Sequence, residues 1–190
     1  NKKKMRIISG FLKGKKIDFL KSEATRPLRD FVKENIFNII NHSNLVSIKL
    51  ENANILDLYS GVGSFGIECI SRGAKKSTFI ENNNKALITL RKNLSDLKIE
   101  NQSKIFNEKT TLFVQSLNIK DKFEIIFFDP PFAESFFIEE LKIIKKTKLY
   151  NKNHLIIIHR EKSTEEKLDK LINILLVKYY GRSKVIFATF

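Results

Sequence analysis

From residue 54 to its end, this chain of 190 residues alternates short apolar runs typical of β-strands with segments that repeat apolar residues at helical spacing. The apolar runs predict strands at 55–59, 77–81, 104–106, 123–129, 154–159, 174–179 and 184–190. The segments between them predict helices at 64–72, 85–97, 111–117, 135–146 and 165–171. Such alternation favours right-handed βαβ units, and so an α/β fold in which helices cover both faces of a mostly parallel sheet. The last two strands flank Gly181 and should form a hairpin, which adds one antiparallel strand to the sheet.

The first 45 residues follow a different pattern. Apolar pieces between residues 5 and 20 are broken by Gly10 and Gly14, which indicates a β-hairpin. Residues 27–40 have helical spacing, and Thr25-Arg26-Pro27 is a suitable helix entry. We therefore predict an N-terminal extension at 1–45 and a main domain at 46–190.

Composition narrows the class of protein. Hydrophobic residues make up 42% of the chain, which is enough for a sizeable core. No apolar run approaches the roughly 20 residues that a membrane-spanning helix needs. A single cysteine, Cys69, excludes an internal disulfide and a CxxC metal site, and we expect it to pack in the core. These features predict a cytoplasmic protein without a metal. The net charge of +14 favours a nucleic-acid partner, although a general lysine bias could also produce it.

A glycine-rich loop, residues 57–66, lies where the first strand of the main domain should meet its helix. Glycines there allow a tight turn and close approach of a ligand, and Glu81 at the end of the next strand could accept both ribose hydroxyls of an adenosine. The spacing Gly61, Gly63, Gly66 also matches dinucleotide enzymes, so the loop alone indicates only a nucleoside cofactor. Asp57 would repel a pyrophosphate but suits the cationic amino-acid end of S-adenosylmethionine, and it therefore favours that cofactor.

The segment Asp129-Pro130-Pro131-Phe132 follows an apolar strand, at the sheet edge where α/β proteins bind ligands. Its prolines fix the backbone and remove two N–H donors, so the Asp129 carboxylate and the Pro130 carbonyl remain as acceptors. Two acceptors could hold the N–H groups of an exocyclic base amine while its nitrogen faces a methyl sulfonium. Phe132 offers a flat face on which a base could stack. This pattern predicts a catalytic segment that methylates a base amine.

His159 ends the strand at 154–159 and would also lie at the ligand edge. We interpret it as a polar strand end rather than a catalytic base, because no Ser or Cys partner is suggested.

With these motifs, nearly the whole chain resembles the RsmD-type 16S ribosomal RNA guanine N2-methyltransferases. The glycine loop and the catalytic segment are shared with other amino-methyltransferases, so segments outside them narrow the choice. These further segments are Thr25-Arg26-Pro27, Ile36-Phe37-Asn38-Ile39, Ser71-Arg72-Gly73-Ala74, Tyr180-Gly181 and the opening Met5-Arg6-Ile7-Ile8. The resemblance implies a Rossmann-like class I methyltransferase with a seven-stranded sheet and an N-terminal hairpin and helix.

The resemblance also implies the cofactor S-adenosyl-L-methionine and one guanine of small-subunit rRNA as the target. We assign the base to Asp129, Pro130, Pro131 and Phe132. We assign the cofactor to Asp57, Tyr59, Ser60, Gly61, Gly63, Glu81, Asn82 and Thr110. We assign RNA contacts to Arg6, Lys13, Lys15, Lys16, Arg26 and Arg29. The expected partner is rRNA within the small subunit or an assembly intermediate, bound by a monomer.

The chain departs from the family pattern in three ways. Ser9 precedes Gly10 where a second glycine is usual, and Phe31 and Lys33 replace two arginines of the N-terminal helix, which bears on the RNA contacts. In the family an acidic or amide residue usually meets the adenine amino group, and the matching position here is Lys109. Asn107, Glu108 or a backbone group could take that role.

Other functions fit parts of the pattern. An adenine or cytosine amino-methyltransferase shares the catalytic segment, but the short chain has no recognisable DNA target-recognition domain. A dinucleotide oxidoreductase is disfavoured by Asp57. A non-catalytic RNA-binding assembly factor on the same scaffold would not need both the acceptors and Glu81.

Overall fold

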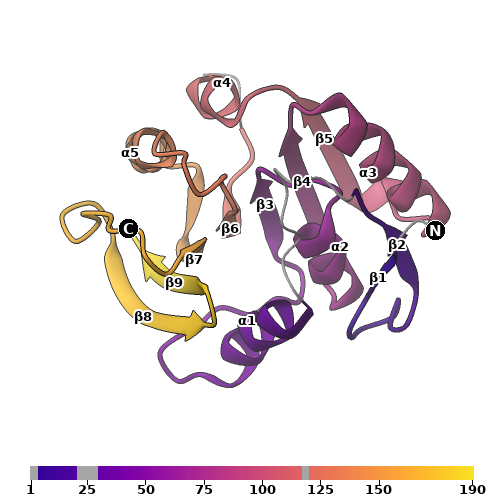
Figure 1. Cartoon of the computed structure of the whole chain (residues 1–190), viewed down its shortest axis with the longest axis horizontal. Coiled ribbons are helices and arrows are strands. Elements are labelled where there is room, and N and C mark those ends of the chain that lie inside the picture. The colour runs from indigo at the N-terminus through magenta and orange to yellow at the C-terminus, as the bar shows by residue number, and fades with distance from the viewer. Residues whose placement is uncertain (1–3, 21–29, 117–119) are drawn as a thin grey trace.

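The computed structural model describes residues 4–20, 30–116 and 120–190, and Figure 1 shows how their elements are arranged. The N-terminal elements are β1 (Lys4–Arg6), β2 (Lys16–Asp18) and α1 (Asp30–His42). The central elements are β3 (Asn54–Leu58), α2 (Ser64–Ser71), β4 (Lys76–Glu81), α3 (Asn84–Asp96), a 3₁₀ turn (Glu100–Gln102), β5 (Ser103–Asn107) and α4 (Thr110–Gln115). The C-terminal elements are β6 (Phe123–Phe128), α5 (Phe137–Thr147), β7 (Tyr150–Glu161), β8 (Asn173–Tyr180) and β9 (Ser183–Thr189).

The large sheet has seven strands in the order β5-β4-β3-β6-β7-β9-β8. The first five strands in this order pair in parallel. Strand β9 is antiparallel to both of its neighbours, so β8 runs in the same direction as the other strands. The expected Rossmann-like class I methyltransferase fold, with one antiparallel strand, is therefore confirmed. Strands β1 and β2 form the expected N-terminal hairpin.

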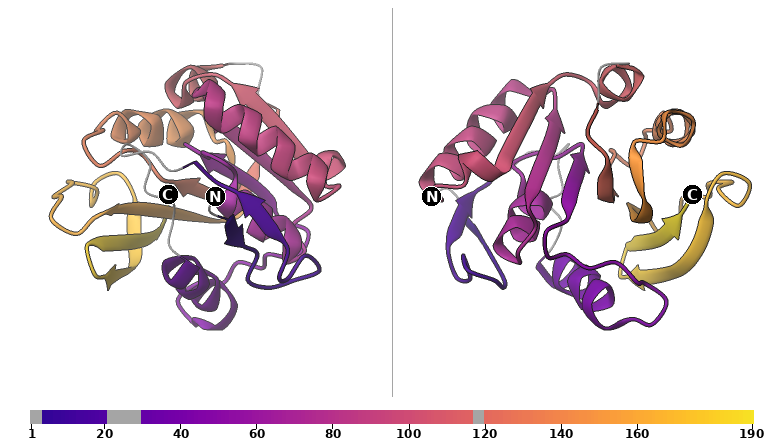
Figure 2. Two further views of the ribbon diagram at one scale, coloured as in Figure 1. Left: turned by 45° about the vertical axis from the view of Figure 1, so that its right-hand side comes forward. Right: turned by 180° about the vertical axis from the view of Figure 1, so that it is seen from behind.

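Alternate residues of the central strands face opposite layers, as strand geometry requires. One layer contains α1, α2, α3 and the hairpin, and the other contains α4, α5 and residues 162–172 (Figures 1 and 2). The strand residues that face α1 and α2 include Ile55, Ile125, Phe127, Ile157 and Phe187. Those that face α4 and α5 include Leu56, Ile126, Phe128, Ile156 and Ile186.

The N-terminal elements bury their apolar residues against the main sheet. Val32, Ile36 and Phe37 of α1 join the cluster that contains Phe65 of α2. The hairpin residues share a second cluster with α2, β4 and α3; they are Met5, Ile7, Leu12 and Ile17. The described part of residues 1–45 therefore shares the core of the main sheet, and the boundary at residue 45 stays a prediction. The helix entry at 25–27 lies outside the described residues.

The helix predicted at 165–171 does not form, and this prediction is wrong. The segment is irregular, although Leu168 and Ile172 are buried under the sheet as the apolar spacing suggested. Glu166 instead lies 2.7 Å from Arg160 Nε and 2.9 Å from Lys184 Nζ, both of which come from strands. These buried ion pairs, formed with residues of β7 and β9, override the local helix propensity.

The other predicted elements are present, with ends that differ by a few residues. Strand β7 is the largest difference, because it begins at Tyr150 rather than at residue 154. Among the described residues, no helix is both long enough and apolar enough to cross a membrane.

Candidate active site

Glu81 links the glycine loop to the end of β4. Its Oε2 accepts a hydrogen bond from Gly61 N at 2.7 Å, and its Oε1 accepts from Asn82 N and Asn83 N at 2.9 and 2.8 Å. Asn83 then caps α3 by accepting from Ala86 N. A carboxylate has about four lone-pair positions, so these three backbone donors leave few of them for a ligand hydroxyl. Glu81 therefore shapes the loop as well as facing the cofactor side.

Asp57 lies inside the sheet and is only 1% exposed. Its Oδ2 accepts from Gly66 N at 2.9 Å, in the first turn of α2. Burial raises the pKa of Asp57 well above its usual value, the bond from Gly66 opposes this, and the nearby charges of Asp129 and Glu81 add to it. Three carboxyl groups, on β3, at the end of β4 and just after β6, are therefore close together, which favours a cationic ligand there.

The loop glycines have different physical roles. A Cβ on Gly63 would lie 2.5 Å from Leu90 Cδ1, and a Cβ on Gly66 would lie 2.4 Å from Phe79 Cε1, so both allow α2 to pack closely. A Cβ on Gly61 would meet nothing within 4 Å, although its φ of +55° is left-handed. The backbone at Gly61 therefore borders open space on the ligand side.

Tyr59 begins the loop with a left-handed φ of +60°. Its hydroxyl donates to Glu140 Oε2 at 2.7 Å, and Thr111 Oγ1 donates to Glu140 Oε1 at 2.8 Å. Glu140 is 1% exposed, and burial raises its pKa. This carboxylate joins the loop to α4 and α5.

The catalytic segment continues the line of β6. Asp129 Oδ1 lies 2.8 Å from His159 Nδ1, and an ionised carboxylate can only accept, so that nitrogen carries the proton. The Phe132 and His159 rings meet edge to face with centroids 5.9 Å apart. Arg160 donates from Nη1 to Pro131 O at 3.0 Å and from Nη2 to Phe132 O at 2.9 Å.

The remaining residues assigned to the cofactor lie around the same edge. Ser60 is nearly buried and its Oγ has no hydrogen-bond partner among the described residues. Asn82 is exposed beside Glu81, and Thr110 is buried at the start of α4. Of the candidate adenine contacts, Asn107 ends β5, and Glu108 and Lys109 lie between β5 and α4.

These features fit S-adenosylmethionine. Gly61 leaves room beside the backbone, Ser60 Oγ is an unpaired polar atom, and the three carboxylates complement a cation. Glu81, Asp57 and Ser60 are therefore the residues that would hold this cofactor.

The basic residues assigned to RNA lie along the hairpin. Arg6, Lys13, Lys15 and Lys16 are exposed, whereas Arg26 and Arg29 lie outside the described residues. The hairpin packs alongside α2. At the start of this helix, Lys33 Nζ donates to both Arg6 O of the hairpin and Ser64 Oγ. At its tip, Phe11 N and Leu12 N bond to Ser71 at the helix end. Lys13 and Lys15 are therefore at the tip, away from the catalytic edge, and Arg6 is nearer to that edge.

Lys33, which replaces a family arginine, is fully buried rather than exposed to RNA. Its Nζ lies 3.5 Å from Glu68 Oε2, and Glu68 also accepts from Ile8 N and Ser9 N at 2.9 and 3.0 Å. Burial lowers the pKa of Lys33, while Glu68 opposes the shift. This pair attaches the hairpin to α2.

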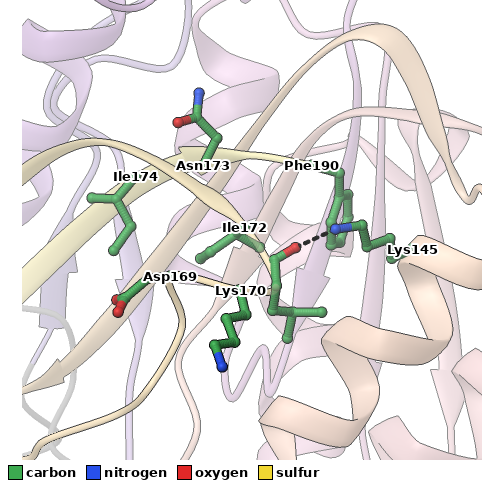
Figure 3. A pocket seen from close by; sticks show the side chains of 8 residues that line it. Lys145, Asp169, Lys170, Ile172, Asn173, Ile174 and Phe190 are labelled. Carbon is green, nitrogen blue, oxygen red and sulfur yellow. Dashed lines mark hydrogen bonds between the residues drawn. The ribbon is translucent and has the colours of Figure 1, made fainter.

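A hollow of about 540 Å³ lies away from this site, between α5 and the start of β8 (Figure 3). Lys145, Asp169, Lys170 and Phe190 line it, and Lys145 Nζ donates to Leu171 O at 2.6 Å. None of the residues assigned to the cofactor or base borders this hollow.

Several side chains that touch the site were missed by sequence reasoning or interpreted differently. His159 was interpreted as a plain strand end, but it contacts Asp129. No motif identified Arg160, Glu166 or Glu140. The only signal was for Arg160, which with Glu161 directly follows the apolar run predicted as a strand at 154–159. The partners of Glu166 and Glu140 lie on other elements, so nothing in their local sequence identified them.

Comparison with known proteins is consistent with this geometry. Residues 5–189 match the model of a family described as "Conserved hypothetical protein 95". The chain is 33% identical to ribosomal RNA small subunit methyltransferase D of Haemophilus influenzae, over 85% of this chain and 81% of that protein. It is 35% identical to the protein of the same name from Buchnera aphidicola, over 84% and 79%. The solved structure of yhhF from Escherichia coli has a TM-score of 0.81 with 24% identity, and the match covers 98% of both chains. This chain therefore belongs to the family of ribosomal RNA small subunit methyltransferase D, the RsmD family.

Proposed function

We propose that this protein transfers a methyl group from S-adenosylmethionine to the exocyclic N2 of a guanine in 16S ribosomal RNA. Family membership supports a methyltransferase, and the names of the relatives support small-subunit rRNA as its substrate. The guanine N2 target comes from the family resemblance. The proposed working form is a monomer that acts on the small subunit or on an assembly intermediate.

One observation carries the chemistry. Among the hydrogen bonds between described residues, none uses Asp129 Oδ2 or Pro130 O, whereas three other acceptors of the segment are engaged. Asp129 Oδ1 is held by His159, and the carbonyls of Pro131 and Phe132 are held by Arg160. The two acceptors that no described residue engages, just past the end of β6, match the two N–H donors of an exocyclic base amine.

The protein then acts by position and charge. When bound, the cofactor supplies an electrophilic methyl group on a sulfonium. Asp129 Oδ2 and Pro130 O would hold the amine so that the nitrogen lone pair faces that methyl group. Asp129 is also placed to accept the proton that the amine releases as the new N–C bond forms. Phe132, half-buried beside His159, would stack on the base.

The test is identification of the methylated nucleoside. The purified protein is incubated with isotopically labelled S-adenosylmethionine and small subunits that lack the modification, and the rRNA is digested to nucleosides. We expect label only in N2-methylguanosine. Label in N6-methyladenosine or N4-methylcytidine would replace the guanine target. Cofactor binding without any transfer to RNA or DNA would favour the non-catalytic assembly factor. Preference for NAD over S-adenosylmethionine in a binding titration would contradict the cofactor.

A further inference from the structure

The last residues of β7 contact the catalytic segment from both faces of the sheet. Strands β6 and β7 are parallel, and Phe128 is in register with Ile158, so Asp129 and His159 are the next residues along each strand. Successive strand residues point to opposite faces. His159 therefore reaches Asp129 on one face, and Arg160 reaches Pro131 and Phe132 on the other.

Both side chains are buried and well oriented. His159 is 5% exposed and Arg160 is 3% exposed. The Arg160 guanidinium donates from Nε to Glu166 Oε1 at 2.7 Å, and from its two Nη atoms to the carbonyls of Pro131 and Phe132. It also lies 4.8 Å from the ring centroid of Phe137, at the start of α5. A planar guanidinium presents donors on three nitrogens in fixed directions, so it can hold Glu166 and two consecutive carbonyls in one rigid arrangement, whereas an ammonium group is a point charge with freely rotating donors.

A second layer supports Arg160. Glu166 Oε2 lies 2.9 Å from Lys184 Nζ on β9, and Lys184 Nζ also donates to Thr164 O. These contacts hold the irregular segment 162–172, which includes the predicted helix at 165–171, against the end of β7. The segment thus supplies the carboxylate that keeps the Arg160 guanidinium in place.

His159 and Arg160 occupy three acceptors of the catalytic segment. These are Asp129 Oδ1, Pro131 O and Phe132 O. No described residue donates to Asp129 Oδ2 or Pro130 O. A base amine presented to this segment would therefore find Asp129 Oδ2 and Pro130 O available, beside three acceptors that are already held in place.

We propose that His159 and Arg160 are positioning residues for the methyl-accepting amine. His159 orients the Asp129 carboxylate, and Arg160 fixes the backbone that carries Pro130 O and the Phe132 ring. Neither residue touches the cofactor side of the site, so both act on the transfer step and not on cofactor affinity. This inference rests on the proposed amine methylation.

The experiment uses graded variants of the full chain. His159→Leu removes the donor, whereas His159→Asn places an amide N–H near the position of Nδ1. Arg160→Met removes the fork, whereas Arg160→Lys keeps a charge for Glu166 but lacks the rigid planar fork. Arg182→Met is the matched control, since Arg182 is an exposed cation near the same strand end that pairs with Glu161. Single-turnover methyl transfer to small subunits and cofactor affinity by calorimetry are measured for each, with thermal unfolding to confirm folding.

We expect His159→Leu and Arg160→Met to lower the single-turnover rate by about tenfold or more, because small misplacements of reacting groups can lower rates by about 10²-fold. Cofactor affinity should stay within a few fold of wild type. His159→Asn should recover much of the rate, Arg160→Lys should recover little, and Arg182→Met should match wild type. A rate near wild type in folded His159→Leu and Arg160→Met would overturn the proposal, as would an equal loss in His159→Asn and His159→Leu.

The two proposals can fail separately. If the wild type does not methylate guanine N2 but methylates another base amine, the guanine target fails and the same rate comparison still decides the positioning roles. If no transfer occurs, NMR of nitrogen-15-labelled histidine decides the contact itself. A hydrogen-bonded His159 Nδ1–H that is lost in Asp129→Ala supports the orientation of Asp129, and a signal unchanged by that substitution overturns it.

Discussion

The two halves of the candidate site are built in different ways. The cofactor half is held mainly through backbone amides, since Glu81 accepts from Asn82 and Asn83 beside it and from Gly61 on the preceding βα loop. The base half is held by side chains from a strand and a loop about 30 residues further along the chain. The β3–α2–β4 unit therefore supplies the Glu81 contacts of the cofactor half, whereas the base half depends on the register of β6 with β7. Five predictions test that difference.

The largest effect should come from Asp129→Ala. Removing the carboxylate takes away one of the two free acceptors and leaves His159 without its partner. We expect single-turnover methyl transfer to fall by at least about 10²-fold, because positioning of reacting groups is lost. Cofactor affinity, measured by calorimetry, should change by no more than a few fold. A rate near that of wild type would remove Asp129 from the mechanism.

Glu81→Ala should give the opposite result. The variant loses the carboxylate that would bind the ribose and that also anchors three loop amides. Hydrogen bonds to charged groups contribute about 1.5–3 kcal/mol each, so cofactor affinity should fall at least about tenfold. Transfer at saturating cofactor should fall less. Glu81→Gln, which keeps one acceptor oxygen, is the control, and unchanged affinity in folded Glu81→Ala would contradict the assignment.

Phe132 tests stacking in the base half. Phe132→Ala should weaken productive binding of the rRNA by about 1–3 kcal/mol, the range measured for loss of base stacking on an aromatic ring. Phe132→Tyr keeps the ring and should have a small effect. The ratio of rate to Michaelis constant for the rRNA substrate measures both. Equal losses in the two variants would show that stacking is not the role of Phe132.

The hairpin lysines test whether RNA affinity lies outside both halves. Replacing Lys13, Lys15 and Lys16 by Ala should flatten the slope of log affinity against log salt by about 2, because each contact with a single-stranded phosphate contributes about 0.7. Cofactor affinity should not change. Arg6→Ala is a useful comparison, since Arg6 lies nearer to the start of α2. An unchanged slope in the triple variant would place recognition elsewhere on the protein.

The smallest effects should appear in the dependence of folding stability on pH. This dependence should have opposite signs for Asp57 in the cofactor half and Glu166 in the base half. Burial raises the pKa of Asp57, so its contribution to stability is present below the unfolded value of about 3.9 and is lost as pH rises through the folded pKa. At Glu166, burial raises the pKa of the carboxyl group, but hydrogen bonds from Arg160 and Lys184 outweigh burial and lower the pKa below its usual value. The Glu166 contribution is therefore present above about 4.3 and is lost as pH falls through its folded pKa.

Two matched variants separate these contributions. Asp57→Asn should raise the unfolding temperature at neutral and higher pH, while it weakens cofactor binding. Glu166→Gln should lower the unfolding temperature near neutral pH and reduce the loss on acidification. Each kcal/mol corresponds to about 2–4 °C for a chain of this size, so shifts of a few degrees are expected in thermal unfolding. Parallel pH profiles of wild type and either variant would contradict the assignment for that residue.

Local sequence patterns were sufficient to predict the alternation of strands and helices, the single antiparallel strand and the position of both motifs. These are local properties, because strand and helix periods and the geometry of glycine and proline are set by neighbouring residues. Gly61, Glu81 and the segment from Asp129 to Phe132 could be found in this way. Their expected roles remain predictions.

The surroundings of the catalytic segment, in contrast, depend on how distant parts of the chain pack together. His159 meets Asp129 because β6 and β7 pair in one register, and Arg160 points to the other face because strand residues alternate. The buried ion pairs of Glu166 with Arg160 and Lys184 replaced a helix that local spacing favoured. Lys33 is likewise buried because Glu68, 35 positions away along the chain, accepts its charge. Each of these outcomes depends on a partner on another structural element, and the period of a local pattern carries no information about such a partner.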